Sequence, residues 1–175
     1  MTACRLITPE DAPVLAELVR INRDFLAPWE PVRGEAYFTD AGQHAAVAVA
    51  LDERERGRSL PCVILDGDGA VVGRINISNI VRGAAQSGSL GYWMAQSAGG
   101  RGVATAAVRD IIRIAFGELG LHRVQADTLV RNVASQRVLA RNGFVRIGLA
   151  PRYLKIAGRW QDCILHQRLN DDAAV

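Results

Sequence analysis

The spacing of apolar residues changes along this chain, and that change constrains the fold more than any other feature. Apolar positions recur at helical spacing in residues 8–22 and 40–56, which predicts two amphipathic helices. The pattern then becomes strand-like, and two β-rich runs flank the sequence Asp-Gly-Asp-Gly at 66–69, a strong hairpin signal. The chain therefore combines amphipathic helices with an antiparallel hairpin.

Beyond the hairpin, strand-like and helical patterns alternate. The segment "SLGYWMA" predicts a strand, residues 101–119 a helix, "HRVQADTLV" a strand and residues 132–144 a short helix. A short strand at residues 3–7 precedes all of these, and two further strands follow residue 144. We therefore predict a mixed α/β (α+β) domain, in which a central sheet of about seven strands is flanked by about four helices.

Length and composition limit the remaining possibilities. With 175 residues, of which 49% are hydrophobic and 22% charged, the chain suits one folded domain. We expect this domain at residues 1–170 and a frayed tail at 171–175. No apolar run reaches membrane-spanning length and no leader pattern opens the chain, so we expect a cytoplasmic protein without membrane contact. The cysteines are far apart and lack metal-ligand spacing, so we expect free thiols and no metal.

A glycine-rich segment leads into the helix predicted at residues 101–119. Backbone N–H groups at a helix start lack intrahelical partners, and together with the helix dipole they bind anions. Gly99, Gly100 and Gly102 would let the loop curve around a phosphate, and Arg101 adds a charged donor. The net charge of +3 also favours an acidic partner such as a phosphorylated cofactor. The spacing alone fits a plain turn equally well, and the residues of nucleotide and dinucleotide phosphate loops are absent.

The segment "GGRGVATAAV" resembles the acetyl-CoA pyrophosphate loop of the GNAT acetyltransferases. Gly102 and Ala104 match the last two defined positions of the family's Gln/Arg-x-x-Gly-x-Gly/Ala pattern, whereas Gly99 departs from its first position. The segments "LAPWEP", "LHRVQADTLVRNVASQRVLARNGF" and "RYLKIAGRWQDCILHQRL" are similar to bacterial ribosomal-protein N-terminal alanine acetyltransferases of the RimJ/RimL type. The matching positions of the last two segments are Asn132, Ser135, Val138, Leu139, Arg141, Gly143, Phe144, Gly158, Trp160 and Asp162. Cys163 stands where His is usual in that group.

This resemblance implies the GNAT fold, with a sheet that is splayed in the middle. The parallel strands "SLGYWMA" and "HRVQADTLV" would part there, and the pantetheine amides of acetyl-CoA would pair with them like an added strand. The implied enzyme moves the acetyl group of acetyl-CoA to a primary amine by direct attack in a ternary complex. We expect the acceptor to be the N-terminal α-amine of a protein, of the ribosomal-protein-alanine type.

Alternatives to this function remain open. The acceptor would otherwise be a small amine, such as an antibiotic or a metabolite, since one fold hosts many acceptors. A non-catalytic acyl-CoA-binding module is the second alternative. In each case we expect no direct readout of nucleic acid, and a monomer or a homodimer.

The family pattern also implies the residues that hold the cofactor. They are Tyr92, Trp93, Met94, Arg101, Gly102, Val103, Ala104, Thr105, Asn132, Ser135 and Arg137. The backbone of residues 101–105 would bind the pyrophosphate. A backbone N–H near Trp93 or Met94, at a bulge, would stabilise the oxyanion. Alternatively, the side chain of Trp93 belongs to the core and Arg137 lies on a solvated helix face.

The implied catalytic residues each have a structural alternative. Ser135 would donate to the departing thiolate, or else bond the local backbone. Asn132 would lie beside the acetyl group, and it also suits the N-cap of its helix. Relatives often have an acidic residue before the tyrosine of the penultimate strand, but Arg152 stands there and cannot accept a proton. Glu30, Asp162 or a water chain remain as the base, and Glu30 would otherwise be a surface-loop charge.

Aromatic residues indicate where the acceptor would bind. In the family, the first two helices, their loop and the last strand pair border the acceptor groove. The expected substrate-binding residues are Phe25, Trp29, Tyr37, Tyr153, Trp160 and Asp162. Aromatic side chains on an irregular loop are unusual without a use, although they would also serve as a lid on the core. A groove open at both ends would favour a protein terminus, and a closed pocket a small amine.

Overall fold

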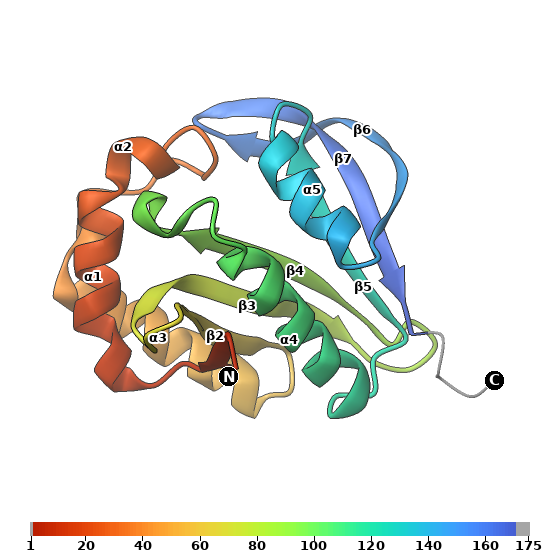
Figure 1. Ribbon diagram of the computed structural model, residues 1–175, viewed down its shortest axis with the longest axis horizontal. Coiled ribbons are helices and arrows are strands. Elements are labelled where there is room, and N and C mark those ends of the chain that lie inside the picture. The colour runs from red at the N-terminus through yellow and green to blue at the C-terminus, as the bar shows by residue number, and fades with distance from the viewer. Residues whose placement is uncertain (1, 171–175) are drawn as a thin grey trace.

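The computed structural model describes residues 2–170, so the expected frayed tail lies outside the described residues. The strands are β1 (Cys4–Leu6), β2 (Leu60–Leu65), β3 (Val71–Val81), β4 (Ser87–Met94), β5 (Arg123–Leu129), β6 (Val145–Ile156) and β7 (Arg159–Leu169). The α-helices are α1 (Ala12–Ile21), α2 (Arg23–Leu26), α3 (Asp40–Glu55), α4 (Val103–Gly117) and α5 (Val133–Arg141). Three short 3₁₀ helices are η1 (Pro9–Asp11), η2 (Glu35–Phe38) and η3 (Gln96–Ala98). The predicted mixed α/β architecture is confirmed (Figure 1).

One sheet contains all seven strands, in the order β1-β2-β3-β4-β5-β7-β6. Neighbouring strands are antiparallel except β4 and β5, which are parallel. The last hairpin therefore enters the sheet with β7 beside β5 and leaves β6 at the edge. The seven strands agree with the predicted number.

The parallel pair β4–β5 separates along its length. Pairing is limited to Ser87 with Arg123, Gly88 with Val124 and Ser89 with Gln125. Beyond these pairs, β4 stays paired with β3 as far as Met94, and β5 stays paired with β7 as far as Leu129. The two halves of the sheet thus diverge, and the predicted splay is confirmed (Figure 1). Edges left unpaired in this way expose backbone donors and acceptors.

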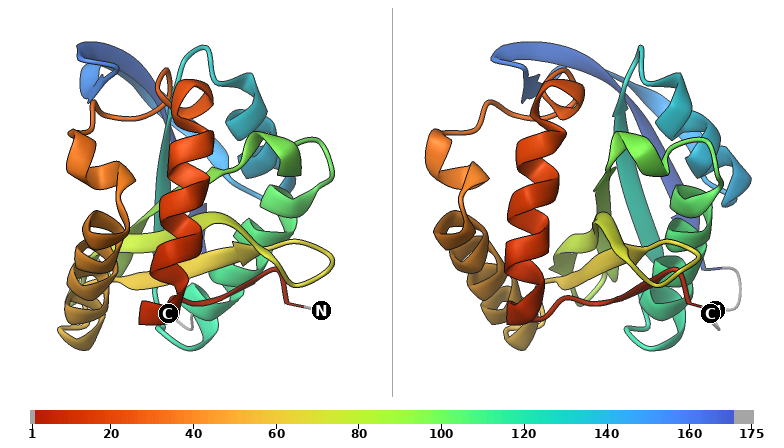
Figure 2. Two further views of the ribbon diagram at one scale, coloured as in Figure 1. Left: turned by 90° about the vertical axis from the view of Figure 1, so that its left-hand side faces the viewer. Right: turned by 60° about the vertical axis from the view of Figure 1, so that its left-hand side comes forward.

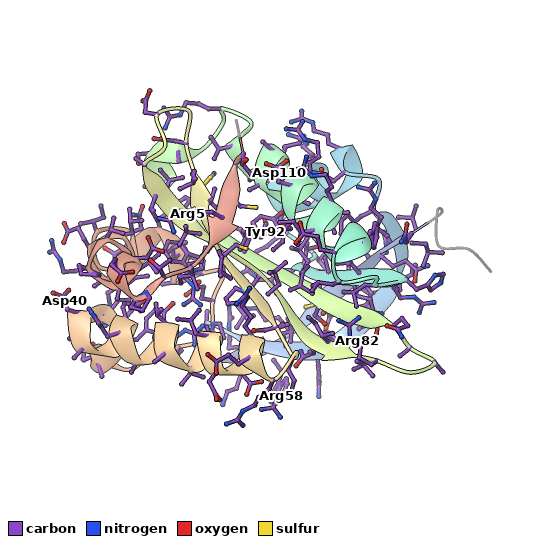
Figure 3. All side chains as sticks on the ribbon, turned by 90° about the horizontal axis from the view of Figure 1, so that it is seen from below. Arg5, Asp40, Arg58, Arg82, Tyr92 and Asp110 are labelled. Atoms are coloured by element: carbon purple, nitrogen blue, oxygen red, sulfur yellow. The ribbon has the colours of Figure 1, made fainter. Side chains whose placement is uncertain are left out.

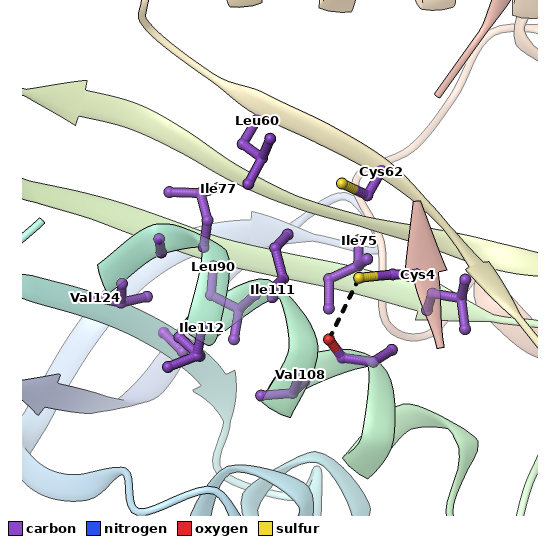
Figure 4. Close-up of a cluster of buried hydrophobic side chains, with 14 of the residues drawn as sticks. Cys4, Leu60, Cys62, Ile75, Ile77, Leu90, Val108, Ile111, Ile112 and Val124 are labelled. Carbon is purple, nitrogen blue, oxygen red and sulfur yellow. Dashed lines mark hydrogen bonds between the residues drawn. The ribbon is translucent and has the colours of Figure 1, made fainter. Parts of the chain in front are cut away.

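Two helical layers cover the sheet. Helices α4 and α5 lie on one face, and α1 and α3 lie on the other (Figure 2). The larger core cluster packs the apolar face of α4 onto strands β1 to β5, with Ile75, Leu90 and Ile111 at its centre (Figure 4). All three cysteines are buried free thiols, as predicted. Within residues 2–170, no helix is long and apolar enough to cross a bilayer.

Helix α2 is a single turn that the sequence pattern does not predict. Asn22 explains it, because its side-chain amide donates to the Leu18 carbonyl at 2.9 Å while its Oδ1 accepts the Gln96 N–H at 2.9 Å. These bonds hold Asn22 outside helical geometry (φ −101°, ψ 13°), so α1 ends and the chain turns into α2. Since Gln96 is far away in sequence, no local pattern indicates this break. Residues 2–170 thus contain five α-helices, of which the single turn α2 is the one beyond the predicted four or so.

Candidate functional site

The N-terminus of α4 has the geometry of a candidate anion site. Its N-cap, Gly102, has a left-handed backbone (φ +78°), as does Gly100 (φ +76°). A Cβ added at either position would meet no protein atom within 4 Å, so open space lies against the loop. The first-turn N–H groups after Gly102 lack intrahelical partners, and no acidic side chain neutralises the first turn. Arg101 is exposed and donates to the Ser97 carbonyl at 3.0 Å.

A pair of hydroxyl groups links β4 to α5. The Tyr92 phenol and the Ser135 Oγ are 2.8 Å apart. Burial raises the pKa of Tyr92 to about 12, and the hydrogen bond with Ser135 offsets only part of that effect. The phenol therefore stays protonated at neutral pH. Tyr92, labelled in Figure 3, is partly buried and packs against the core cluster beneath α4.

Asn132 is the N-cap of α5. Its Oδ1 accepts the backbone N–H of Ser135 at 3.1 Å, which is the capping geometry that the sequence suggested. Ser135 is thus fixed twice, through its N–H by Asn132 and through its hydroxyl by Tyr92. Arg137 lies further along the same helix and is exposed.

The expected bulge near Trp93 is absent. From Ser78–Ser89 to Gly73–Met94 the β3–β4 register runs one to one, and the shift in register lies beyond it, between Ser78 and Val81. The Trp93 side chain packs against the core beneath α1 and α3, so its role as a core residue is confirmed. An oxyanion donor on β4 would have to come from the edge that β5 leaves open.

A cavity of about 290 Å³ lies on the face of α1. It is lined by Val19, Arg23, Leu26, Ala27, Glu30, Pro31, Val32, Arg33, Tyr37, Phe38 and Ala157. Glu30 and Tyr37 are brought together here as predicted, and the Glu30 side chain is only 17% exposed. Burial raises the pKa of Glu30, and Arg33, at 3.9 Å, and Arg74 offset part of the shift. Glu30 is therefore not a free surface charge.

Contacts join the loop after α2 to the last hairpin, and Ala157 of that hairpin lines the cavity. The Ala157 N–H donates to the Glu30 carbonyl at 2.9 Å. Arg131 donates to the Pro28 carbonyl at 2.7 Å, also bonds Gln161, and lies over the Trp29 ring at 5.2 Å from its centroid. Arg131, which sequence reasoning missed, thus holds the early loop against the last hairpin.

The other predicted substrate residues lie elsewhere. Trp160 and Asp162 line a separate open groove of about 500 Å³, together with Arg131. Asp162 accepts the backbone N–H of Arg152 at 2.8 Å, which stabilises the left-handed backbone of Arg152 (φ +49°). Phe25 (39% exposed) and Tyr153 (45% exposed) line neither cavity. Trp29 also lines neither cavity, so Tyr37 lies in the first cavity, Trp160 and Asp162 lie in the groove, and the structure does not bring the predicted set together.

Two charged residues near the site were missed by sequence reasoning. Arg74 on β3 pairs with Trp93; burial lowers its pKa, and the nearby Tyr37 and Glu30 partly offset this effect. Asp127 on β5 has a pKa raised by burial. Strand alternation in "HRVQADTLV" was the available signal, because it places Asp127 opposite the apolar face of that strand.

The fold and the site define an acetyltransferase, and the chain belongs to the GNAT family. Residues 4–145 match the family model described as an acetyltransferase (GNAT) domain. The chain is 35% identical, over 92% of its length and 84% of the relative's, to the ribosomal protein uS5-alanine N-acetyltransferase of Escherichia coli strain K12. It is 34% identical, over 86% of its length and 84% of the relative's, to the probable N-acetyltransferase YjcK of Bacillus subtilis strain 168.

Solved structures agree with these relatives. A ribosomal-protein-S5-alanine acetyltransferase from Vibrio fischeri has 35% identity and a TM-score of 0.92, covering 98% of this chain and 94% of that one. RimJ of Mycobacterium smegmatis, solved with CoA-disulfide, has 32% identity and a TM-score of 0.92, covering 98% of this chain and 83% of that one. The chain is an acetyl-CoA-dependent N-acetyltransferase, as predicted, which disfavours the non-catalytic module. The open start of α4 and the β4–β5 gap fit this cofactor.

Proposed function

We propose that this enzyme acetylates the N-terminal α-amine of a protein, of the ribosomal-protein-alanine type. The observation that carries the proposal is the arrangement around the β4–β5 gap. The anion site of α4 and the Tyr92–Ser135 pair lie on one face of the sheet, and the cavity with Glu30 lies on the other. A donor and an acceptor bound from opposite faces would meet in the gap, which supplies the proximity that direct transfer needs.

The cofactor side would use groups whose geometry is set before binding. The backbone N–H groups of residues 102–105 would bind the pyrophosphate, with Arg101 and Arg137 nearby as further donors. When bound, acetyl-CoA supplies an activated acyl group. The Ser135 hydroxyl, held by Tyr92 and by the Asn132 cap, would donate a hydrogen bond where the sulfur leaves.

The size and lining of the cavity favour an acceptor that inserts a single terminal residue. At about 290 Å³, it lies at the small end of the range for ligand pockets, so most of a protein acceptor would stay outside. Its lining is mainly apolar and has one carboxylate, Glu30, with Arg33 at 3.9 Å, whereas Arg23 of the same lining is ion-paired with Glu35. One carboxylate suits one ammonium group, and the positive charge of Arg33 disfavours a polyamine. The E. coli relative acts, by its name, on an alanine of ribosomal protein uS5, which supports the same class and a cytoplasmic location.

One observation favours the alternative acceptor, a small amine, so the assay includes such amines. Ala157 of the last hairpin lines the cavity and bonds Glu30, so the hairpin covers that side, and a closed pocket favours a small acceptor. The assay is thiol release from acetyl-CoA with Ala- and Ser-starting ribosomal peptides, aminoglycosides, polyamines and amino acids. Each peptide is matched by the same peptide already blocked at its terminus. Release with free but not blocked peptides, with the acetyl group mapped to the terminal nitrogen, supports the proposal. Release with small amines alone contradicts it.

A further inference from the structure

Asp127 occupies a distinctive place in the sheet. The last β4–β5 pair joins Ser89 to Gln125, and Asp127 follows where the strands have parted. Val124 and Ala126 point into the core beneath α4, so alternation directs Asp127 to the opposite face. Trp93, whose side chain packs beneath α1 and α3, marks that face as the acceptor side. Asp127 therefore lies beside the gap, on the face from which the acceptor would approach.

The carboxylate of Asp127 is half-buried yet not engaged. Among residues 2–170, no hydrogen bond or ion pair is found for its side chain. Burial raises its pKa, and His166 on β7 offsets only part of this effect. The other titratable groups facing it are Tyr153 on β6 and Cys163 on β7, and Asp127 raises the pKa of both. Neither of these supplies a positive charge that would hold Asp127 as a structural ion pair.

The other acidic candidates are less suited to removing a proton at the gap. Asp162 already accepts the Arg152 N–H and lies in the separate groove with Trp160. Glu30 lies near Arg33 and Arg74, whose positive charges favour its ionised form and oppose its taking up a proton. Asp127 has neither constraint, and a raised pKa brings a carboxylate closer to the range in which it acts as a base near neutral pH.

We propose that Asp127 is the catalytic residue that accepts the proton of the acceptor ammonium. This inference rests on the proposed N-acetyl transfer to an amine. Transfer of one proton from R–NH3+ to the carboxylate gives a neutral amine and a carboxylic acid. The nitrogen lone pair then forms the C–N bond as the C–S bond breaks. The second nitrogen proton passes to the departing sulfur, and Asp127 returns its proton to solvent, so that one proton is released overall.

The arrangement divides the proton chemistry between the two faces of the sheet. Asp127 receives a proton on the acceptor face, and the Tyr92–Ser135 pair donates hydrogen bonds on the cofactor face. Asp127 is on β5, Tyr92 is on β4 across the gap, and Ser135 is on α5. Because Asp127 and the hydroxyl pair lie on opposite faces, neither competes for the other's proton.

The test compares Asp127→Asn with Asp68→Asn, a matched loss of one carboxylate in the exposed β2–β3 turn. Thiol release is measured with whichever amine of the panel the wild-type enzyme acetylates, from pH 6 to pH 10. Asp127→Asn should lower kcat/KM at pH 7 by about 10-fold, because only about a tenth of an amine with a pKa of about 8 is neutral at that pH. The loss should shrink as pH rises past the amine pKa of about 8, because the neutral amine then needs no base. Asp68→Asn should match the wild type throughout.

Binding and stability give readouts that a merely structural role would not reproduce. The Kd of coenzyme A should be unchanged in Asp127→Asn. Its melting temperature at pH 7 should rise, because an ionised carboxylate with a raised folded-state pKa lowers stability above that pKa. Unchanged kcat/KM, or a loss that is equal at every pH, would overturn the assignment. A wild type that is silent with every amine would instead overturn the proposed function itself.

Discussion

Replacing Gly102 with alanine tests the anion site at the start of α4. The left-handed backbone of Gly102 (φ +78°) makes a Cβ cost about 1–2 kcal/mol. No protein atom lies within 4 Å of that Cβ, so no clash adds to this cost. In a chain of 175 residues, the melting temperature should therefore fall by about 2–8 °C.

The larger effect is expected on the cofactor. The new methyl group would occupy the open space in front of the first-turn N–H groups of α4, which are the proposed phosphate donors. Losing one hydrogen bond to a charged group costs about 1.5–3 kcal/mol. This corresponds to a Kd for coenzyme A that is about 10- to 150-fold weaker, measured by titration calorimetry.

Gly57 supplies the matched control. It has a similar backbone (φ +70°) and open space around its Cβ, but it lies just after the C-terminal end of α3. Gly57→Ala should therefore lower the melting temperature by a similar amount and leave the Kd unchanged. Equal Kd values for Gly102→Ala and the wild type would refute the anion site, and an equal weakening in both variants would show that strain alone is responsible.

Three further substitutions address the rest of the site. Ser135→Ala should lower kcat by about 10²-fold while the Kd of coenzyme A changes little; equal losses of both would indicate packing instead. Asn132→Ala removes the cap of α5, so calorimetry should show a loss of about 1 kcal/mol, and an unchanged melting temperature would argue against the cap. Glu30→Gln should raise the melting temperature at pH 7 more than at pH 4. Burial raises the folded-state pKa of Glu30, so its ionised form destabilises the fold as pH rises; a fall at pH 7 would contradict this.

The sequence predicts the elements of this fold better than their arrangement. Local periodicity was sufficient to predict the β2–β3 hairpin and α4, because the residues that carry these signals are close together in the chain. The position of β7 between β5 and β6 depends on pairing between distant strands, which no local pattern encodes. The break after α1 likewise depends on Asn22 bonding Gln96.

As with the fold, the local features of the site were predictable from the sequence, and its long-range contacts were not. The glycine loop and the N-cap of α5 have local signals, and resemblance supplied their proposed roles. The bulge at Trp93 was a wrong expectation, because β3 and β4 match residue for residue there. The pairing of Tyr92 with Ser135 and the contacts of Arg131 join segments that meet only in the folded chain.

The contacts between the early loop and the last hairpin affect the order in which the parts of the site form. Ala157 bonds Glu30, and Arg131 bonds Pro28 and Gln161, so these contacts join an early segment to the last hairpin. During synthesis the N-terminal segments emerge first, and contacts between distant segments form late. The α4 loop, Tyr92 and Ser135 all precede β6 in the chain. The residues proposed to bind the cofactor are therefore synthesised before the hairpin that completes the acceptor side.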